Sequence, residues 1–421
     1  MNRLDIIALE KQKRAERLEK FKLRLIKFAY GLFLTYSLLG HIDIFSSPLK
    51  MLTYLAIGIL LVNFIIQYNK SPDEGLVWYI VLMLIALVHS YFSGNFGFFK
   101  LMLFAGSMRT IGFKAIIRFD MKLRAALIII VSVLCSIGIA PDDVHMDSGV
   151  LRRSMGFTNP NTLGIAVFVL ICDILYTYDF KINFKITAVV SAITFWMYFF
   201  ARSRTATLAI LVLIFIAALY NYIPQMFKSK FFKCVCYITP FLLSILTYFA
   251  TVSYMNMGEL GINVNRFLSG RVQSIVSHVE MFRVTFWGQN IGETIHKTLD
   301  NTFAFVLYGL GIGVFVLFFV FYIRTVKNNF KYNNIHLVII MLAFMCYGLS
   351  EHLWINVDYN IFMLAFAYNP KNEFEIADES ELQKIPQNQK YMRYFKNKND
   401  KYFKSRSIQK EYLKKYIKGS K

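Results

Sequence analysis

The chain has 421 residues, a hydrophobic fraction of 56% and a formal net charge of +21. Its apolar residues lie in long unbroken runs, which excludes an ordinary soluble domain, because such a domain covers its core with amphipathic segments. The runs do not alternate between apolar and polar residues, which also excludes a transmembrane β-barrel.

Runs of this kind predict membrane-spanning helices, since roughly 20 apolar residues are needed to cross the hydrocarbon core of a bilayer. We predict about twelve of them, in an all-α polytopic membrane protein with one large external loop that contains amphipathic helices. The runs lie at 26–44, 51–67, 76–92, 96–108, 123–140, 163–178, 186–201, 205–222, 233–252, 302–323, 335–350 and 353–369.

These runs divide the chain into five regions. They are a basic N-terminal segment at 1–25, the first nine spans at 26–252 with an external loop at 141–162, the large external loop at 253–300, the last three spans at 301–369 and a basic tail at 370–421.

Lysine and arginine concentrate in segments that this arrangement places on one side of the membrane. The segments are 1–25, 109–122, 179–185, 224–233, 324–332 and 370–421. Positive charge marks the cytoplasmic side of membrane proteins, so we expect a multi-pass protein with both termini in the cytoplasm. Basic segments beside spans attract anionic headgroups, and we therefore expect membrane lipids rather than nucleic acid as the partner of this charge.

Two of the segments predicted to lie outside are long, 141–162 and 253–300. In the second, Ser269 is a candidate N-cap for a helix. Apolar residues then recur at helical spacing at Val272, Ile275, Val276 and Val279. Such an amphipathic helix would lie on the outer membrane face or over a cavity, with Arg271 and His278 on its polar side. The alternative is a helix that only packs on the bundle.

Charged side chains gather at the predicted outer ends of spans, where they are costly and are therefore candidates for function. They are Arg152, Arg153, Arg202, Arg204, Arg266, Arg271, Asp300, Glu351 and His352. Arginine donates paired hydrogen bonds to phosphate oxygens, so this set favours a shared anionic ligand, such as a lipid-linked phosphate or pyrophosphate, over separate headgroup contacts. Asp300 and Glu351, with His278 or His352, would supply a base for a sugar hydroxyl.

Four segments stand in order along residues 150–323: "RRSMGFTNPNTLG" from Arg152, "SRTATLAI" from Ser203, "RFLSGRVQSIVSHVEMF" from Arg266, and "DNTFAFVLYGLGIG" from Asp300. Each lies on the predicted outer side. The set resembles the segments that bacterial O-antigen ligases and Wzy-type polysaccharide polymerases carry in the same order, and the many spans with one large late external loop are similar as well.

The resemblance implies that Arg204 and Arg271 bind the pyrophosphate of an undecaprenyl-linked glycan. In the ligases, a histidine just before the asparagine of the fourth segment is taken as the acid/base group, whereas this chain has Asp300 there. An aspartate can take the proton when burial raises its pKa. This departure favours a polymerase over a ligase. Rival bases on the same loop are His278, Glu280 and His296.

The first segment contains a turn of its own. Asn159 and Asn161 flank a proline and would turn the chain before the span that begins near Thr162. Arg153 would then face the outer cavity and help to shape a lipid-pyrophosphate site. An ordinary turn at the start of a helix is the alternative. The full set of candidate substrate-binding residues is Arg153, Asn159, Asn161, Arg202, Arg266, His278, Glu351 and His352.

These observations predict a glycosyltransferase of the bacterial cytoplasmic membrane that polymerises undecaprenyl-pyrophosphate-linked oligosaccharide repeat units on the outer face, for a capsule, exopolysaccharide or O-antigen. Arg204, Arg271 and Asp300 are the predicted catalytic residues. The sequence contains no P-loop, Rossmann or zinc motif, so we expect neither cofactor nor metal. The resemblance implies a flippase and a chain-length regulator as partners. The alternatives are an O-antigen-type ligase and a flippase or transporter of lipid-linked oligosaccharide.

Overall fold

The chain, seen in a computed structural model, is described over residues 3–70, 74–108, 112–147, 149–291 and 299–367. The described residues belong to one compact unit, Met1–Pro370. The predicted basic tail at 370–421 lies outside the described residues, as does the candidate base His296.

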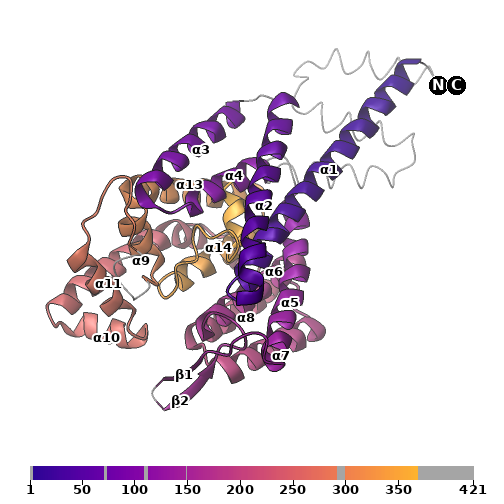
Figure 1. Ribbon diagram of the computed structural model, residues 1–421. Helices are drawn as coiled ribbons and strands as arrows, with labels where there is room; N and C mark the ends of the chain where they lie inside the picture. The colour runs from indigo at the N-terminus through magenta and orange to yellow at the C-terminus, as the bar shows by residue number, and fades with distance from the viewer. Residues whose placement is uncertain (1–2, 71–73, 109–111, 148, 292–298, 368–421) are drawn as a thin grey trace. The chain divides into compact units, whose positions relative to one another are not determined.

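The first unit is built of helices with one short β-hairpin (Figure 1). The first half contains α1 (Arg3–Leu39), α2 (Asp43–Lys70), α3 (Glu74–Ser93), α4 (Gly97–Met108), α5 (Phe113–Ser136), β1 (Val144–Asp147), β2 (Val150–Arg153), α6 (Pro160–Thr177), α7 (Phe184–Ala201) and α8 (Arg204–Tyr222). The second half contains η1 (Met226–Lys228), α9 (Lys230–Met255), α10 (Glu259–Phe267), α11 (Arg271–Met281), α12 (Thr302–Ala304), η2 (Phe305–Gly309), α13 (Gly311–Lys331), α14 (Ile335–Tyr347) and η3 (Ile361–Phe366).

Six helices in the described part of the chain are long and apolar enough to cross a membrane, by length and composition. They are α2, α6, α7, α8, α9 and α13, and shorter apolar helices lie at Val77–Ser93, Gly97–Met108 and Ile335–Tyr347. The prediction of a helical membrane protein is confirmed at this level. The antiparallel hairpin of β1 and β2, in the loop at 141–162, was not predicted.

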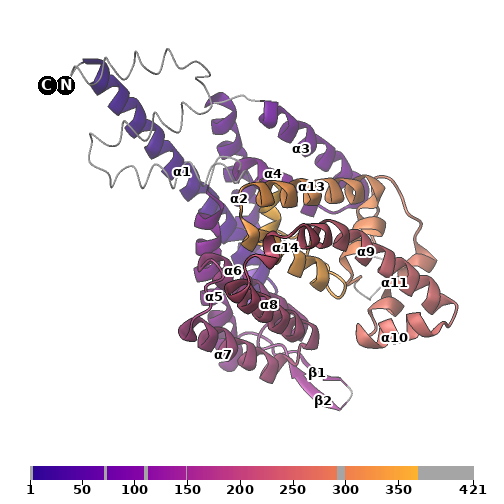
Figure 2. The ribbon, with the colours of Figure 1, turned by 180° about the vertical axis from the view of Figure 1, so that it is seen from behind.

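Helix α6 is the most enclosed of these helices. It contacts α5, α7, α8 and α14, and its residues from Thr162 to Thr177 are buried. Figure 2 shows it behind α8 from the opposite side of the molecule. Asn159 caps the helix by accepting a hydrogen bond from the Thr162 amide at 2.9 Å, and Pro160 occupies the first helical position, where its missing N–H costs nothing. The polar turn predicted before this span is therefore the start of a central helix.

The predicted span at 353–369 is wrong as a helix. Its described part is irregular apart from the 3-10 segment η3, and most of it is buried. The Asp358 carbonyl accepts a hydrogen bond from Arg124 of α5, and the Phe362 ring packs against Phe113 and Tyr176. This irregular backbone is therefore enclosed by the rest of the protein, which supplies hydrogen-bond partners for it.

The predicted span at 302–323 is interrupted by the π-helix η2, after which Gly311 has a φ of +85° and α13 begins. The segment that follows α11 packs against this break. Backbone hydrogen bonds join the Ile312 amide to the Thr285 carbonyl and the Gly313 amide to the Phe286 carbonyl. A Cβ atom on Gly311 would meet the Phe286 carbonyl oxygen at 2.5 Å, so the close approach requires glycine.

Helix α11 packs on the protein through its predicted apolar face. Val272 is buried with Ala250 of α9, and Ile275 is buried with Leu299 and Ala304. Its N-cap is Gly270, in the left-handed region at φ +88°, and not Ser269 as predicted. The apolar face is therefore covered by the helical bundle, which is the second of the two arrangements considered for this helix.

Deep between α1, α5 and α6 lies a polar network that is shielded from solvent. The Arg124 guanidinium donates to the Tyr30 hydroxyl at 3.0 Å and to the Asp120 carboxylate at 3.1 Å, and Tyr30 donates to Asp120 at 2.9 Å. Asp173 lies 3.9 Å from the same guanidinium, and the side chains of Arg124, Asp120 and Asp173 are each 0% exposed. One cation thus compensates two buried carboxylates from different helices.

Replacing Arg124 with leucine is expected to destabilise the protein by about 3–5 kcal/mol, because both carboxylates would be left buried without a cation. Thermal unfolding of the purified protein in detergent measures the change. The matched control is Arg118→Leu on the same helix, where the side chain is exposed, and we expect a change within about 0.5 kcal/mol. Equal unfolding temperatures for Arg124→Leu and wild type would show that the network contributes nothing.

Candidate functional site

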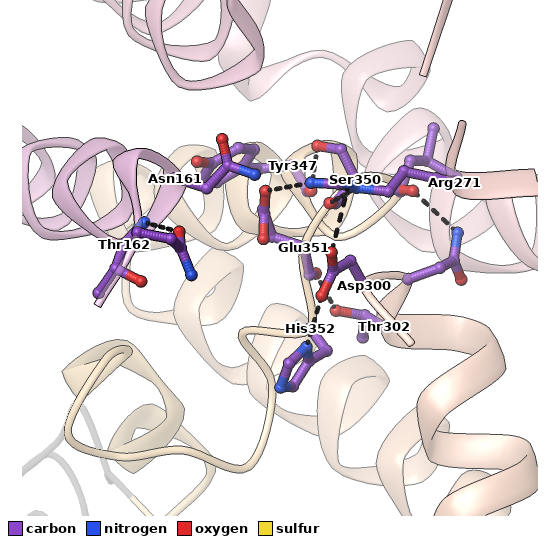
Figure 3. Close-up of polar contacts among 12 residues, drawn as sticks. Asn161, Thr162, Arg271, Asp300, Thr302, Tyr347, Ser350, Glu351 and His352 are labelled. Atoms are coloured by element: carbon purple, nitrogen blue, oxygen red, sulfur yellow. Dashed lines mark hydrogen bonds and ion pairs between the residues drawn. The ribbon is translucent and has the colours of Figure 1, made fainter. Parts of the chain in front are cut away.

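Arg271, the first residue of α11, is the centre of the candidate site. Its Nε atom donates to the Ser350 carbonyl at 3.0 Å, its Nη2 atom to Glu351 Oε1 at 3.1 Å, and its Nη1 atom lies 3.3 Å from Asp300 Oδ2. The Arg271 side chain is 20% exposed. One guanidinium therefore joins three parts of the chain that are far apart in sequence, and Figure 3 shows their side chains converging on it.

One backbone hydrogen bond and two from side chains to backbone carbonyls hold two of these parts together. The Thr302 amide donates to the Gly348 carbonyl at 2.7 Å, the Thr302 hydroxyl to the Glu351 carbonyl at 2.8 Å, and the Asn301 side chain to the Leu349 carbonyl at 2.9 Å. Asn301 also caps α12 by accepting from the Ala304 amide. The pair that follows Asp300 thus fastens the start of α12 to the end of α14, which fixes Asp300 beside Glu351.

Glu351 is almost fully buried, with 6% of its side chain exposed. Burial raises the pKa of this carboxyl to about 7, because the charged form loses its hydration, and the neighbouring Arg271 opposes that rise. Asp300 adds to it as a second negative charge. A carboxyl with a pKa near neutrality can exchange a proton at physiological pH, which is a property common at functional sites.

His352 completes the cluster. Its Nδ1 atom lies 3.6 Å from Asp300 Oδ1, and its side chain is 31% exposed. The ring stacks on Phe305 of η2, with 4.8 Å between the ring centroids and 27° between the planes. The aromatic contact fixes the plane of the imidazole, so that one edge faces Asp300.

The turn before α6 forms a second polar group. Arg152 donates to the Ala201 carbonyl at 3.1 Å and to Asn161 Oδ1 at 2.7 Å. A Cβ atom on Gly164 would lie 2.6 Å from Ser203 Oγ, so the first turns of α6 and α8 are in close contact. The first two segments of the resemblance, far apart in sequence, therefore meet at the N-termini of these helices.

Tyr347, at the end of α14, lies between the two groups. Its hydroxyl is buried, faces Thr205 in the first turn of α8, and makes no hydrogen bond of good geometry within the described residues. Glu351 and Arg271 are its charged neighbours on the other side. Figure 3 shows the start of α6 on one side of this cluster and Arg271 on the other.

Of the predicted site residues, the structure brings together Arg271, Asp300, Glu351 and His352. Asn161 belongs to the neighbouring group through Arg152, whereas Asn159 is exposed and acts as a helix cap. Arg204 is the exposed first residue of α8, next to Thr205.

The other predicted site residues have different surroundings. Arg153 forms an ion pair with Asp142 at 2.6 Å, and its place at the substrate site stays a prediction. Arg202 lies over the ring of Tyr198 at 5.2 Å. Arg266 is exposed in the last turn of α10. His278 is buried in α11, bonds the Ser274 carbonyl and stacks on Phe282, which leaves it poorly placed for a soluble or lipid-linked substrate.

Two of the residues at this site were not among those predicted to bind substrate. The sequence marks both Arg152 and Arg153 as charges on the predicted outer side. Only the geometry of β2 shows that Arg152, and not Arg153, contacts Asn161. Tyr347 lies within an apolar run, where no sequence signal distinguishes it from a core residue.

Among the described residues, no three His, Cys, Asp or Glu side chains are placed to hold a metal ion. Comparison with known proteins finds no matching family model, no matching curated protein and no matching solved structure.

The raised pKa of Glu351 predicts a pH-dependent stability. The carboxyl has a pKa of 4.5 when unperturbed and about 7 in the fold, so the folded chain holds a proton that the unfolded chain has lost between these values. Stability should therefore fall as pH rises from about 4.5 to about 7, by at most about 1.4 kcal/mol per pH unit. Thermal unfolding in detergent from pH 4 to 8 measures this slope. Glu351→Gln should flatten the slope of stability against pH. The control Glu280→Gln, at an exposed position on α11, should not. Identical slopes for Glu351→Gln and wild type would contradict the prediction.

The two neighbouring arginines of β2 should differ in their effects. Arg152→Ala removes the hydrogen bonds to Asn161 and Ala201 and should lower stability by about 1–3 kcal/mol, because the Asn161 and Ala201 oxygens lose a charged donor. Arg153→Ala removes a half-exposed ion pair and should cost at most about 1 kcal/mol. The same unfolding assay compares them, and an equal or larger loss for Arg153→Ala would reverse our assignment.

Proposed function

We propose that the protein is a multi-pass glycosyltransferase of the bacterial cytoplasmic membrane with both termini in the cytoplasm. It polymerises undecaprenyl-pyrophosphate-linked oligosaccharide repeat units on the outer face of the membrane, for a capsule, exopolysaccharide or O-antigen. The proposal includes about twelve membrane crossings, the last of which is the irregular buried segment that ends at η3.

The observation that carries the proposal is that the four segments of the resemblance meet in space. Arg152 and Gly164 join the first segment to the second, at Ala201 and Ser203. The third and fourth are joined by the ion pair of Arg271 with Asp300. Tyr347 links the two halves, since its hydroxyl faces both Thr205 and the Arg271 group. A chance similarity of short segments gives no reason for them to converge.

The charges of the site suit a pyrophosphate. Arg271 presents a planar guanidinium, and Arg204 stands at the exposed N-terminus of α8, where the helix dipole adds partial positive charge. Backbone amides in that first turn lack a side-chain cap, because Ser203 makes no capping hydrogen bond. Both arginines would neutralise the charge that develops on the leaving pyrophosphate, which is a contribution often worth several kcal/mol in the transition state.

The reaction is a single displacement at the anomeric carbon of the donor. A hydroxyl of the non-reducing sugar on a second lipid-linked unit attacks this carbon and forms the new glycosidic bond. The bond from the anomeric carbon to the phosphate oxygen breaks, undecaprenyl pyrophosphate leaves, and the configuration inverts. The acceptor proton passes to a base in the group of Asp300, Glu351 and His352, which lie together where Arg271 would hold the donor.

The function is tested by complementing cells from which the gene is deleted and measuring glycan chain length on gels. Wild type should restore polymer ladders, whereas Arg271→Ala should leave single repeat units, because losing one charged donor to a transition-state anion costs about 10²–10³-fold in rate. Arg283→Ala is the matched control, since this arginine is exposed on the same external segment, and it should restore full ladders.

Three outcomes decide between the candidate functions. Full ladders with Arg271→Ala would show that the site is not catalytic. Deletion cells in which a finished polymer accumulates on the carrier lipid, without transfer to another acceptor, would identify a ligase. Repeat units that accumulate on the inner leaflet in deletion cells would identify a flippase.

A further inference from the structure

The carboxylate of Asp300, which occupies the position of the ligase histidine, is engaged by Arg271. Its Oδ2 atom lies 3.3 Å from the guanidinium, and only 17% of the side chain is exposed. The ion pair holds the Asp300 carboxylate against the guanidinium. Glu351 is also held by Arg271, from which it accepts a hydrogen bond, and it is still more deeply buried. Neither carboxylate is free to approach a sugar hydroxyl while Arg271 holds it.

His352 differs from both carboxylates in exposure and orientation. It is the most exposed member of the group, with 31% of its side chain accessible compared with 17% for Asp300 and 6% for Glu351. The buried Nδ1 atom faces Asp300, and Phe305 supports the plane of the ring. Figure 3 shows the other ring nitrogen turned away from Asp300. Because Nδ1 is buried on the Asp300 side, at 3.6 Å and without a hydrogen bond, the outward-facing Nε2 is the nitrogen that can accept a proton from a substrate.

We infer that His352 is the general base of the proposed transfer and that Asp300 is a positioning residue that orients the imidazole. The inference rests on the proposed function. In the step, the acceptor hydroxyl gives its proton to Nε2 of His352 while its oxygen bonds to the anomeric carbon. The electron pair of the broken bond leaves with undecaprenyl pyrophosphate. The imidazolium then returns the proton to solvent, which the exposed edge of the ring can reach.

The role predicts a pH dependence, because only the neutral imidazole accepts a proton. The charged groups around His352 are Asp300, which faces Nδ1, and Glu351, with Arg271 beyond them. Asp300 orients the ring without itself taking the proton, so its removal should lower the rate and leave the acid limb of the profile in place. A residue with a merely structural role would lower the rate without shifting the pH profile.

The test uses the purified full-length protein in lipid nanodiscs, with lipid-linked repeat units extracted from deletion cells as the substrate. Initial rates of polymer formation are measured from pH 5 to 9. Wild type should lose activity on the acid side. His352→Gln should lower the rate about 10²–10⁴-fold and remove that acid limb. Asp300→Asn should retain more activity than His352→Gln and keep the acid limb, because the imidazole is still present.

Two controls separate chemistry from folding and binding. His145→Gln alters an exposed histidine that also pairs with an aspartate, Asp143, on the hairpin, and it should leave the rate and the pH profile unchanged. Stabilisation of the protein by added undecaprenyl pyrophosphate should be the same for His352→Gln and wild type, because the base does not hold the pyrophosphate.

The two proposals fail in different ways. A wild-type rate for His352→Gln, or an acid limb that His352→Gln leaves in place, would overturn the role of His352 while polymerisation by wild type still supports the function. If wild type forms no polymer from the lipid-linked units, both proposals are overturned.

Discussion

The contacts of the Arg271 guanidinium are those on which the architecture of the candidate site depends. A cation with 20% of its side chain exposed needs compensation, and here two carboxylates and a carbonyl supply it from segments that are far from Arg271 in sequence. It therefore fixes the start of α11, Asp300 and the chain that leaves α14 in one place. The hydrogen bonds of Asn301 and Thr302 to the end of α14 support the same junction through the backbone.

A second buried cation, Arg124, has the corresponding role within the bundle. It links α1, α5 and α6 and also donates a hydrogen bond to the Asp358 carbonyl. The irregular chain between Glu351 and η3 thus begins at one arginine and reaches the other. Its backbone is not helical and must find hydrogen bonds in the surrounding protein, which explains why most of its residues are buried and why arginine is one of its donors.

The arrangement of the site also bears on the proposed binding of an anion. In this structure both Nη atoms of Arg271 face carboxylates, so under the proposed function a pyrophosphate would share these donors with Asp300 and Glu351. Glu351 has a pKa raised to about 7 and would become neutral more readily as the negative charge of the ligand approached. Arg204 is exposed and would meet an anion without such competition.

What the sequence determined by itself was local. Continuous apolar runs specify helices because each backbone group in such a helix is satisfied within its own segment, and Asn159 and Asn301 cap helices through neighbouring amides. Charges at the ends of these runs identified Arg271, Asp300, Glu351 and His352 as a candidate group, since a charge beside a membrane span needs a reason.

Which of these charges contact one another depends on the tertiary structure. Arg152 and Arg153 are adjacent in sequence, and the alternation of a β-strand sends one to Asn161 and the other to Asp142. Tyr347 joined the site because the end of α14 packs against α8, and Asp300 was found beside His352 because Asn301 and Thr302 fasten their segments together. The final apolar run, at 353–369, is largely irregular and not helical, and groups elsewhere in the bundle, Arg124 among them, supply hydrogen bonds to its backbone. Contacts between distant segments depend on how the helices pack, and the spacing of residues along one segment does not predict that packing.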